Sequence, residues 1–100
     1  MSLIDVGTMP DGRFQVFRIR NGDVITKWHA REGGWVKDWQ NLGKPGKGAV
    51  ALRVAHMKDG RMEVFTVDSD GECFNIWQQQ QGGWSGSQPG RNAAWQSLGK

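Results

Sequence analysis

The sequence predicts an all-β protein in which two four-stranded antiparallel sheets form neighbouring blades of a propeller. Nearly the whole chain of 100 residues is a tandem repeat, each repeat holds four apolar runs of strand length, and no window shows a convincing helical period. Repeats of about 40–50 residues with four strands each are typical of propeller blades. We therefore expect one blade at residues 1–44 and a second at 45–100, with a loop insertion at 85–94.

The repeat appears when the chain is shifted by 48 residues against itself, with one added residue in a middle loop and seven more before the end. Three motifs then coincide: DGR (11–13 with 59–61), GGW (33–35 with 82–84) and WQxLGK (39–44 with 95–100). Chance is a poor explanation for a match that covers nearly the whole chain.

Each repeat reads as four strands joined in chain order. The apolar runs span residues 3–9, 13–19, 23–30 and 38–42 in the first repeat, and 50–57, 61–67, 72–79 and 93–98 in the second. Asp-Gly or Asn-Gly separates the first three runs, and these dipeptides tolerate the positive φ angles of tight hairpin turns. Gly-Gly-Trp separates the third run from the fourth.

Two such sheets can pack as a self-contained sandwich or lie as neighbouring blades. In the third runs, Val24 and Cys73 share a face with a tryptophan, whereas Ile25 and Phe74 point the other way. A sandwich needs one polar face, but an inner blade is covered on both sides. The apolar residues on both faces favour the propeller, and we expect Cys73 to be a buried core thiol.

The motif series DGRMEVFTVDSDGECFNIWQ, GGWSG and WQSLG resembles the blade motif of the Photorhabdus-type fucose-binding lectins, which are seven-bladed propellers. The second repeat matches most of that motif, and the first keeps DGR, VF, NG, Trp28, GGW, Trp39 and LG. The resemblance implies binding of fucose or O-methylated sugars. The chain departs from this family in holding two blades. Fucose lectins of the Ralstonia type also have two repeats and trimerise into six blades, but their motif spacing around Trp differs.

Two blades cannot close a ring. The chain ends at Gly99-Lys100, the repeat position at which Gly43-Lys44 leads into the next blade. We expect copies to associate head to tail, because such heterologous contacts either close into a ring or propagate. Propellers of about four to eight blades allow two, three or four copies. A six-bladed trimer is favoured and an eight-bladed tetramer is next; a fragment of a longer chain is the alternative.

The tryptophans are the main candidates for ligand contact, because an indole face can cover the apolar side of a sugar ring while polar groups bind its hydroxyls. Trp35 and Trp84 follow Gly-Gly in loops, where we expect sugar contact or inter-blade packing. The other four are expected to pack within or between blades: Trp28, Trp77, Trp39 and Trp95. The polar candidates near these loops are Arg31, Lys37, Asp38, Gln79 and Ser87. A pair of Arg31 with Asp38 would hydrogen-bond vicinal hydroxyls. The alternative for each of these polar residues is a solvated loop side chain that contacts no ligand.

Composition and charge argue against nucleic-acid binding, an internal disulfide, a membrane helix and a signal peptide. The net charge of +3 comes from scattered Lys and Arg residues, which does not favour nucleic-acid binding. A single cysteine excludes an internal disulfide. No run approaches the ~20 apolar residues of a membrane helix. The N-terminus does not resemble a signal peptide, so we expect cytoplasmic synthesis and leave non-classical release open.

Catalytic and metal sites find little support in the sequence. No GxSxG or HExxH motif appears. The run DSDGE at 68–72 lacks the ligand series of an EF-hand and indicates a hairpin turn. We therefore expect no enzyme, no cofactor and no metal site. The leading hypothesis is a multivalent carbohydrate-binding lectin; the alternative is a structural or protein-interaction propeller that binds no sugar.

Overall fold

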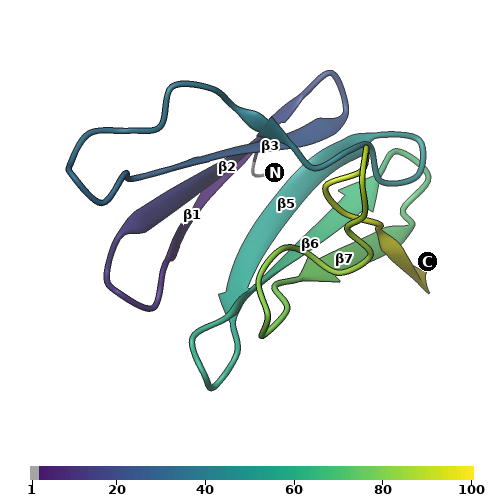
Figure 1. Cartoon of the computed structure of the whole chain (residues 1–100). Helices are drawn as coiled ribbons and strands as arrows, with labels where there is room; N and C mark the ends of the chain where they lie inside the picture. The colour runs from purple at the N-terminus through teal and green to yellow at the C-terminus, as the bar shows by residue number, and fades with distance from the viewer. Residues whose placement is uncertain (1–2) are drawn as a thin grey trace.

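The computed structural model describes residues 3–100, which form two four-stranded antiparallel sheets without a helix in that range. The first sheet contains β1 (Ile4–Thr8), β2 (Phe14–Arg20), β3 (Asp23–Trp28) and β4 (Gln40–Asn41). The second contains β5 (Ala49–His56), β6 (Met62–Asp68), β7 (Cys73–Trp77) and β8 (Gln96–Gly99). Strands pair in chain order within each sheet (Figure 1). The predicted all-β class and the two antiparallel sheets are confirmed, and both sheets have the form of a propeller blade.

The turns form where the sequence places Gly after Asn or Asp. Between β2 and β3, Asn21 and Gly22 both adopt positive φ, 53° and 84°, as a two-residue hairpin turn requires. Between β1 and β2, the Asp11 carboxylate accepts hydrogen bonds from the backbone N–H and the Nε of Arg13. These two bonds hold the pKa of Asp11 below its ordinary value. Asp59 and Arg61 repeat this arrangement between β5 and β6.

The fourth strands are shorter than the sequence indicates. Trp39 and Trp95 precede β4 and β8 instead of opening them. The third strand of the second sheet ends at Trp77. The glutamines that follow form a turn, because Gly82 and Gly83 adopt positive φ and the Gln79 N–H donates to the Gly83 carbonyl. The insertion at 85–94 folds onto itself through a bridge between Gln88 and Arg91.

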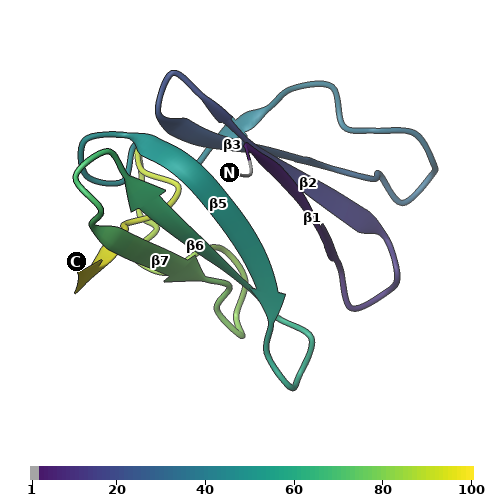
Figure 2. The same cartoon turned by 180° about the vertical axis from the view of Figure 1, so that it is seen from behind.

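The sheets pack face to face, with β5 beside β1 in both views (Figures 1 and 2). Alternate residues of each strand point to opposite faces. Phe17 of β2 points toward the second sheet, and Met62 and Val64 of β6 point toward the first; all three are fully buried. The Trp84 ring meets Phe17 edge-on, with centroids 5.8 Å apart. Phe65 corresponds to Phe17 in the repeat, but it lies next to Val64 in the strand and therefore points away from the first sheet. The two sheets thus meet through opposite faces of the same blade motif.

Polar contacts fix the junction between the two sheets. The Asp5 carboxylate accepts a hydrogen bond of 2.8 Å from the Val54 N–H, and His56 Nε2 accepts one of 3.0 Å from the Thr8 N–H. At the outer strands, Trp95 Nε1 donates to the Leu42 carbonyl at 2.9 Å. These bonds join backbone groups of one sheet to side chains of the other, so they select this register of the two sheets.

The linker between the sheets passes close to the β2–β3 turn. Ala49 N–H donates to the Gly22 carbonyl at 2.9 Å. A Cβ on Gly22 would lie 2.9 Å from the Gly48 Cα, and both residues have positive φ. Glycine is therefore required at both positions for the linker to lie this close.

Asp68, at the end of β6, joins the β6–β7 turn to the linker. Burial raises the pKa of its carboxyl group, but backbone N–H donors from Glu72, Lys47 and Asp70 outweigh burial and hold the pKa below its ordinary value. The native state therefore favours the ionised carboxylate. This contribution to stability is present above the unfolded-state pKa of ~3.9 and is lost as the pH falls through the lower native-state value.

Asp68→Asn is expected to lower the melting temperature clearly at pH 7 and less at pH 3, because pH 3 lies below the unfolded-state pKa of ~3.9 and part of the carboxylate's contribution to stability is already lost there. Asp70→Asn is the matched control, because its exposed ion pair with Lys47 contributes little to stability. Thermal unfolding followed by circular dichroism at both pH values tests this. Equal losses for Asp68→Asn at the two pH values would contradict the role of the ionised carboxylate.

Candidate functional site

A hollow of 240 Å³ opens at the junction between the two sheets. From the first repeat it is lined by Met9, Gln15, Trp28 and Gln40, and from the second by Gln78, Gly83 and Trp84. Gln15 and Trp28 are directly opposite each other in the β2–β3 ladder, and Gln78 bridges to Trp84 across the GGW loop. Ligand pockets for drug-sized molecules span about 300–1,000 Å³, so this hollow suits a ligand of about one ring.

Amide groups supply the polar part of this hollow. Gln15 is buried, and its Nε2 donates to the Thr26 hydroxyl at 3.0 Å, which leaves the amide oxygen as its second polar atom. Gln78 is used the opposite way: its Oε1 accepts from the Met62 N–H at 2.8 Å, which leaves the amide nitrogen. The pair therefore offers one acceptor and one donor. None of the lining residues carries an ionisable side chain, so the hollow is suited to a neutral ligand.

The two indoles of the hollow differ in exposure. Trp28 is half-buried and offers ring surface, whereas Trp84 is only 4% exposed because its ring packs against Phe17. The sequence favours Trp84 as a sugar contact and Trp28 as a packing residue. The geometry makes Trp28 the more accessible ring at this position.

The other predicted polar residues do not line the hollow. Arg31 lines a separate surface hollow with Asp11, Arg13 and His29, and Asp38 is not among the residues that line it. Lys37 and Asp38 are exposed, as is Ser87, whose N–H donates to the Trp84 carbonyl. Gln79 and Trp77 line another hollow with Arg61. The structure thus brings Trp28 and Trp84 together and leaves the charged candidates on the loop surface.

Five residues of the hollow are not among the sugar-binding candidates that the sequence indicates: Met9, Gln15, Gln40, Gln78 and Gly83. One signal was present in the sequence. Gln15 lies in the middle of a strand on the same face as Phe17, where a buried amide needs hydrogen-bond partners. Its repeat counterpart Glu63 is also polar. Gln78 is one of the polar residues near the second GGW loop, but its place in the hollow depends on contact between the sheets.

The first sheet has an apolar outer face, turned away from the second sheet, that consists of Ile4, Val6, Phe14, Val16, Trp35 and Trp39. Trp35 is 48% exposed, whereas its repeat counterpart Trp84 is 4% exposed at the junction. The same contrast separates Ile4 (57%) from Leu52 (1%) and Phe14 (50%) from Met62 (0%). Trp39 lies beside two cations, with Arg18 Cζ 5.8 Å and Lys27 Nζ 5.2 Å from its ring centroid.

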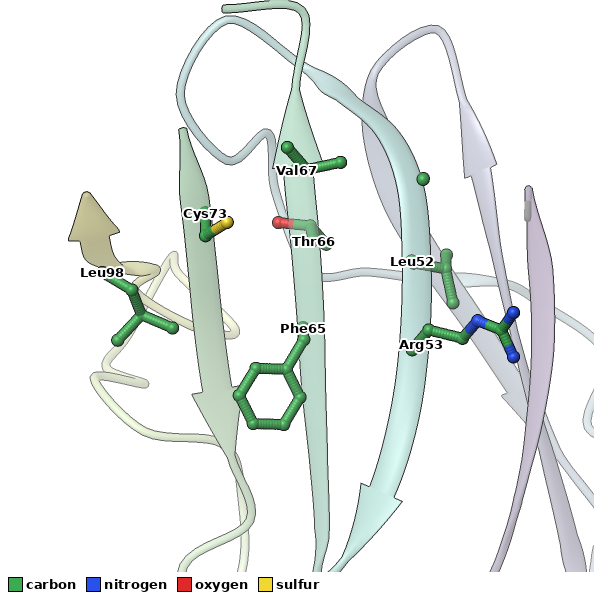
Figure 3. Close-up of a pocket in the computed structure, with 8 residues that line it drawn as sticks. Leu52, Arg53, Phe65, Thr66, Val67, Cys73 and Leu98 are labelled. Carbon is green, nitrogen blue, oxygen red and sulfur yellow. The ribbon is translucent and has the colours of Figure 1, made fainter. Parts of the chain in front are cut away.

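The second sheet has the complementary outer face, which consists of Phe65, Val67, Cys73 and Leu98 (Figure 3). Leu98 is 53% exposed, whereas its counterpart Leu42 is 1% exposed. Cys73 is only half-buried, so the expectation of a buried thiol is wrong for this chain: its counterpart Val24 is covered by the second sheet, but nothing among residues 3–100 covers Cys73 in the same way. A hollow of 380 Å³ lies over this apolar face.

No family model matches the chain, and no curated protein matches it at a significant level. Among residues 3–100, no group of three or more His, Cys, Asp or Glu side chains is placed to hold a metal ion. The described residues also contain no helix long and apolar enough to cross a membrane.

Proposed function

We propose that this chain is a carbohydrate-binding lectin whose blades assemble into a propeller from several copies. The observation that carries the proposal is the hollow between the sheets, where the half-buried Trp28 ring lies among the Gln15, Gln40 and Gln78 amides. An aromatic ring beside neutral donors and acceptors is the combination that a sugar ring needs, since a sugar has an apolar C–H side and a rim of hydroxyls. The resemblance to the Photorhabdus-type blade motif adds fucose or a related neutral sugar as the ligand.

Assembly is supported by the two outer faces. Within the chain, the face that bears Phe17 and Leu42 is covered by the face that bears Met62 and Trp84. The repeat counterparts of Phe17 and Leu42 are Phe65 and Leu98, on the outer face of the second sheet. The repeat counterparts of Met62 and Trp84 are Phe14 and Trp35, on the outer face of the first sheet. One copy can therefore bind the next through the same contact that joins its own two sheets. This association is head to tail.

Specific groups are available to repeat the internal junction between copies. Trp95 Nε1 donates to the Leu42 carbonyl inside the chain, so the Trp39 indole of one copy would donate to the Leu98 carbonyl of the next. The outer face of the first sheet carries Arg18 and Lys27, whereas the outer face of the second carries an acid and a base, Glu63 and Arg53. Three copies, giving six blades, is the favoured ring, and four copies are the next. Several equivalent sites on one particle would raise the avidity for a glycan surface.

Sugar binding can be followed at the tryptophans, because each of the six Trp residues contributes one indole N–H signal in protein labelled with ¹⁵N-tryptophan. Titration with methyl α-L-fucoside is expected to shift the signals of Trp28 and Trp84. Trp28→Ala should weaken binding at this hollow at least tenfold, about 1.4 kcal/mol, because the stacking surface is lost. Trp28→Phe should retain most of the affinity.

Lys58→Ala is the matched control, since this exposed side chain belongs to the β5–β6 turn and is absent from the hollow. It should leave the titration unchanged. If neither the fucoside nor a panel of neutral monosaccharides shifts any indole signal, the lectin proposal is wrong. The structural or protein-interaction propeller, which the exposed apolar faces also favour, would then be the better account.

A further inference from the structure

We propose that Thr26, which does not itself line the hollow between the sheets, determines which hydrogen-bonding groups a ligand must carry there. Its hydroxyl holds the Gln15 amide with the oxygen toward the hollow, so the first sheet offers an acceptor and the second sheet, through Gln78, offers a donor. Thr26 is thus a positioning residue that acts through Gln15. This role deepens the proposed function, and its effect on ligand selection rests on that function.

Thr26 of β3 lies on the face of the first sheet that is turned toward the second sheet. In the β2–β3 ladder it is opposite Phe17. Gln15 lies two residues before Phe17, so its side chain is the diagonal neighbour of Thr26 on this face. Thr26 is 0% exposed, whereas Gln15 is 4% exposed and lines the hollow. A ligand in the hollow can therefore touch Gln15 but not Thr26.

The direction of two hydrogen bonds determines which end of the Gln15 amide faces Thr26. A threonine hydroxyl has one proton to donate, and that of Thr26 goes to the Val16 carbonyl at 2.8 Å. Only lone pairs are then left for Gln15, and they accept from its Nε2 at 3.0 Å. The amide nitrogen is held at Thr26, and the oxygen is at the other side of the same planar group.

The Gln15 amide oxygen is an acceptor that lacks a donor in the described part of the chain. None of residues 3–100 donates to it, and the enclosed side-chain atoms without a partner in that range are Thr66 Oγ1 and Asn75 Oδ1. The oxygen of Gln15 is therefore open to the hollow. A ligand that displaces water there must supply a donor, because an unpaired acceptor in a buried place is unfavourable.

The second repeat shows that the diagonal neighbour decides how this position bonds. There Asn75 replaces Thr26 and Glu63 replaces Gln15. The Asn75 amide nitrogen donates to the Glu63 carboxylate, so the hydrogen bond runs in the opposite direction to the one in the first sheet. Threonine at position 26 is therefore what makes the Gln15 amide use its nitrogen within the sheet.

The second sheet supplies a donor whose orientation is fixed in a similar way. The Gln78 amide oxygen accepts from the Met62 backbone N–H at 2.8 Å, which leaves the amide nitrogen for the hollow. The hollow thus requires a hydroxyl that donates beside Gln15, whereas a hydroxyl or an ether oxygen can accept beside Gln78. A site built to pair with a hydroxyl discriminates against an analogue that lacks it, because the polar group of the site is left unpaired.

The positioning role can be tested without a ligand, through the side-chain amide signals of Gln15 in ¹⁵N-labelled protein. Thr26→Val removes the hydroxyl and should speed exchange of the Gln15 Nε2 protons with water about tenfold, because one buried hydrogen bond is lost. Thr26→Ser should keep the wild-type rate. Thr66→Val is the matched control, because that buried hydroxyl has no hydrogen-bond partner among residues 3–100 and does not line the hollow. Unchanged exchange in Thr26→Val would overturn the role of Thr26.

Ligand selection is tested with methyl α-L-fucoside and with analogues in which fluorine, which cannot donate a hydrogen bond, replaces one hydroxyl at a time. Binding is followed by the indole signals of Trp28 and Trp84. In the wild type, one analogue should bind at least about tenfold more weakly than the fucoside. In Thr26→Val the Gln15 amide can turn its nitrogen to the hollow, so this difference should fall below about threefold. Thr26→Ser and Thr66→Val should keep the wild-type difference.

The possible failures are distinguishable. If every analogue binds the wild type as the fucoside does, no ligand hydroxyl donates to Gln15, and the selection is wrong while the lectin proposal stands. If one analogue binds the wild type and Thr26→Val equally weakly, the ligand hydroxyl pairs with another group and the role of Thr26 in selection is wrong. If neither the fucoside nor a panel of neutral monosaccharides shifts an indole signal, the lectin proposal and the selection are both wrong, and the exchange rates still test whether Thr26 orients Gln15.

Discussion

Leu98→Asp is expected to convert the assembled protein into single chains while both sheets remain folded. Leu98 is 53% exposed in one chain, so a carboxylate at this position has access to water there. Between copies it would take the place that Leu42 has at the internal junction, 1% exposed and among apolar side chains. Burial of an unpaired charge costs several kcal/mol, so the variant should strongly weaken each contact between copies.

Light scattering after size exclusion, together with circular dichroism, tests the Leu98 variant. Lys58→Asp introduces the same carboxylate on an exposed turn and should keep the wild-type mass. A Leu98→Asp particle of unchanged mass would show that this face does not form the contact between copies.

Phe17→Ala and Phe65→Ala form a second test, because the two residues correspond in the repeat and differ only in what covers them. Phe17 is fully buried against Trp84, and truncation of a buried phenylalanine costs about 3–5 kcal/mol in free energy of unfolding. Phe65 is half-buried on the outer face of the second sheet. We expect a similar cost for Phe65→Ala in the assembled protein and a much smaller cost in the Leu98→Asp background.

Chemical denaturation of both phenylalanine variants in both backgrounds measures this difference. The Phe17 variant is the internal control, because its cost should be nearly the same with and without assembly. If Phe65→Ala costs as little in the wild-type background as in the Leu98→Asp background, no second copy covers Phe65, and the argument from repeat positions is wrong.

The sheets could be predicted from the sequence because their determinants are local. Asn-Gly and Asp-Gly mark the hairpins, and alternation sets the two faces of each strand. The fourth strands were harder to predict: Trp39 and Trp95 have high strand propensity, but they leave the ladder to pack beside cations in one case and to bond the Leu42 carbonyl in the other. Tertiary contacts override propensity there.

The hollow could be predicted only in part. The sequence indicates Trp28 as a packing residue and Trp84 as a ligand contact. Which of the two rings keeps an accessible face depends on Phe17 of the first sheet, which packs against Trp84 of the second. The repeat also treats Trp35 and Trp84 as equivalent, whereas one is exposed and the other buried. Correspondence in sequence therefore indicates which groups can make the same contact, and the fold decides which of them have made it within one chain.

We propose that the two blades of one chain are completed by blades of other copies. The native mass of the wild-type chain in dilute solution, measured by light scattering behind a sizing column, tests it most directly. We expect a particle of three chains, and a particle of four would keep the head-to-tail contact with a different ring size. A stable single chain at all concentrations would contradict it, because both apolar outer faces would then have to remain in water.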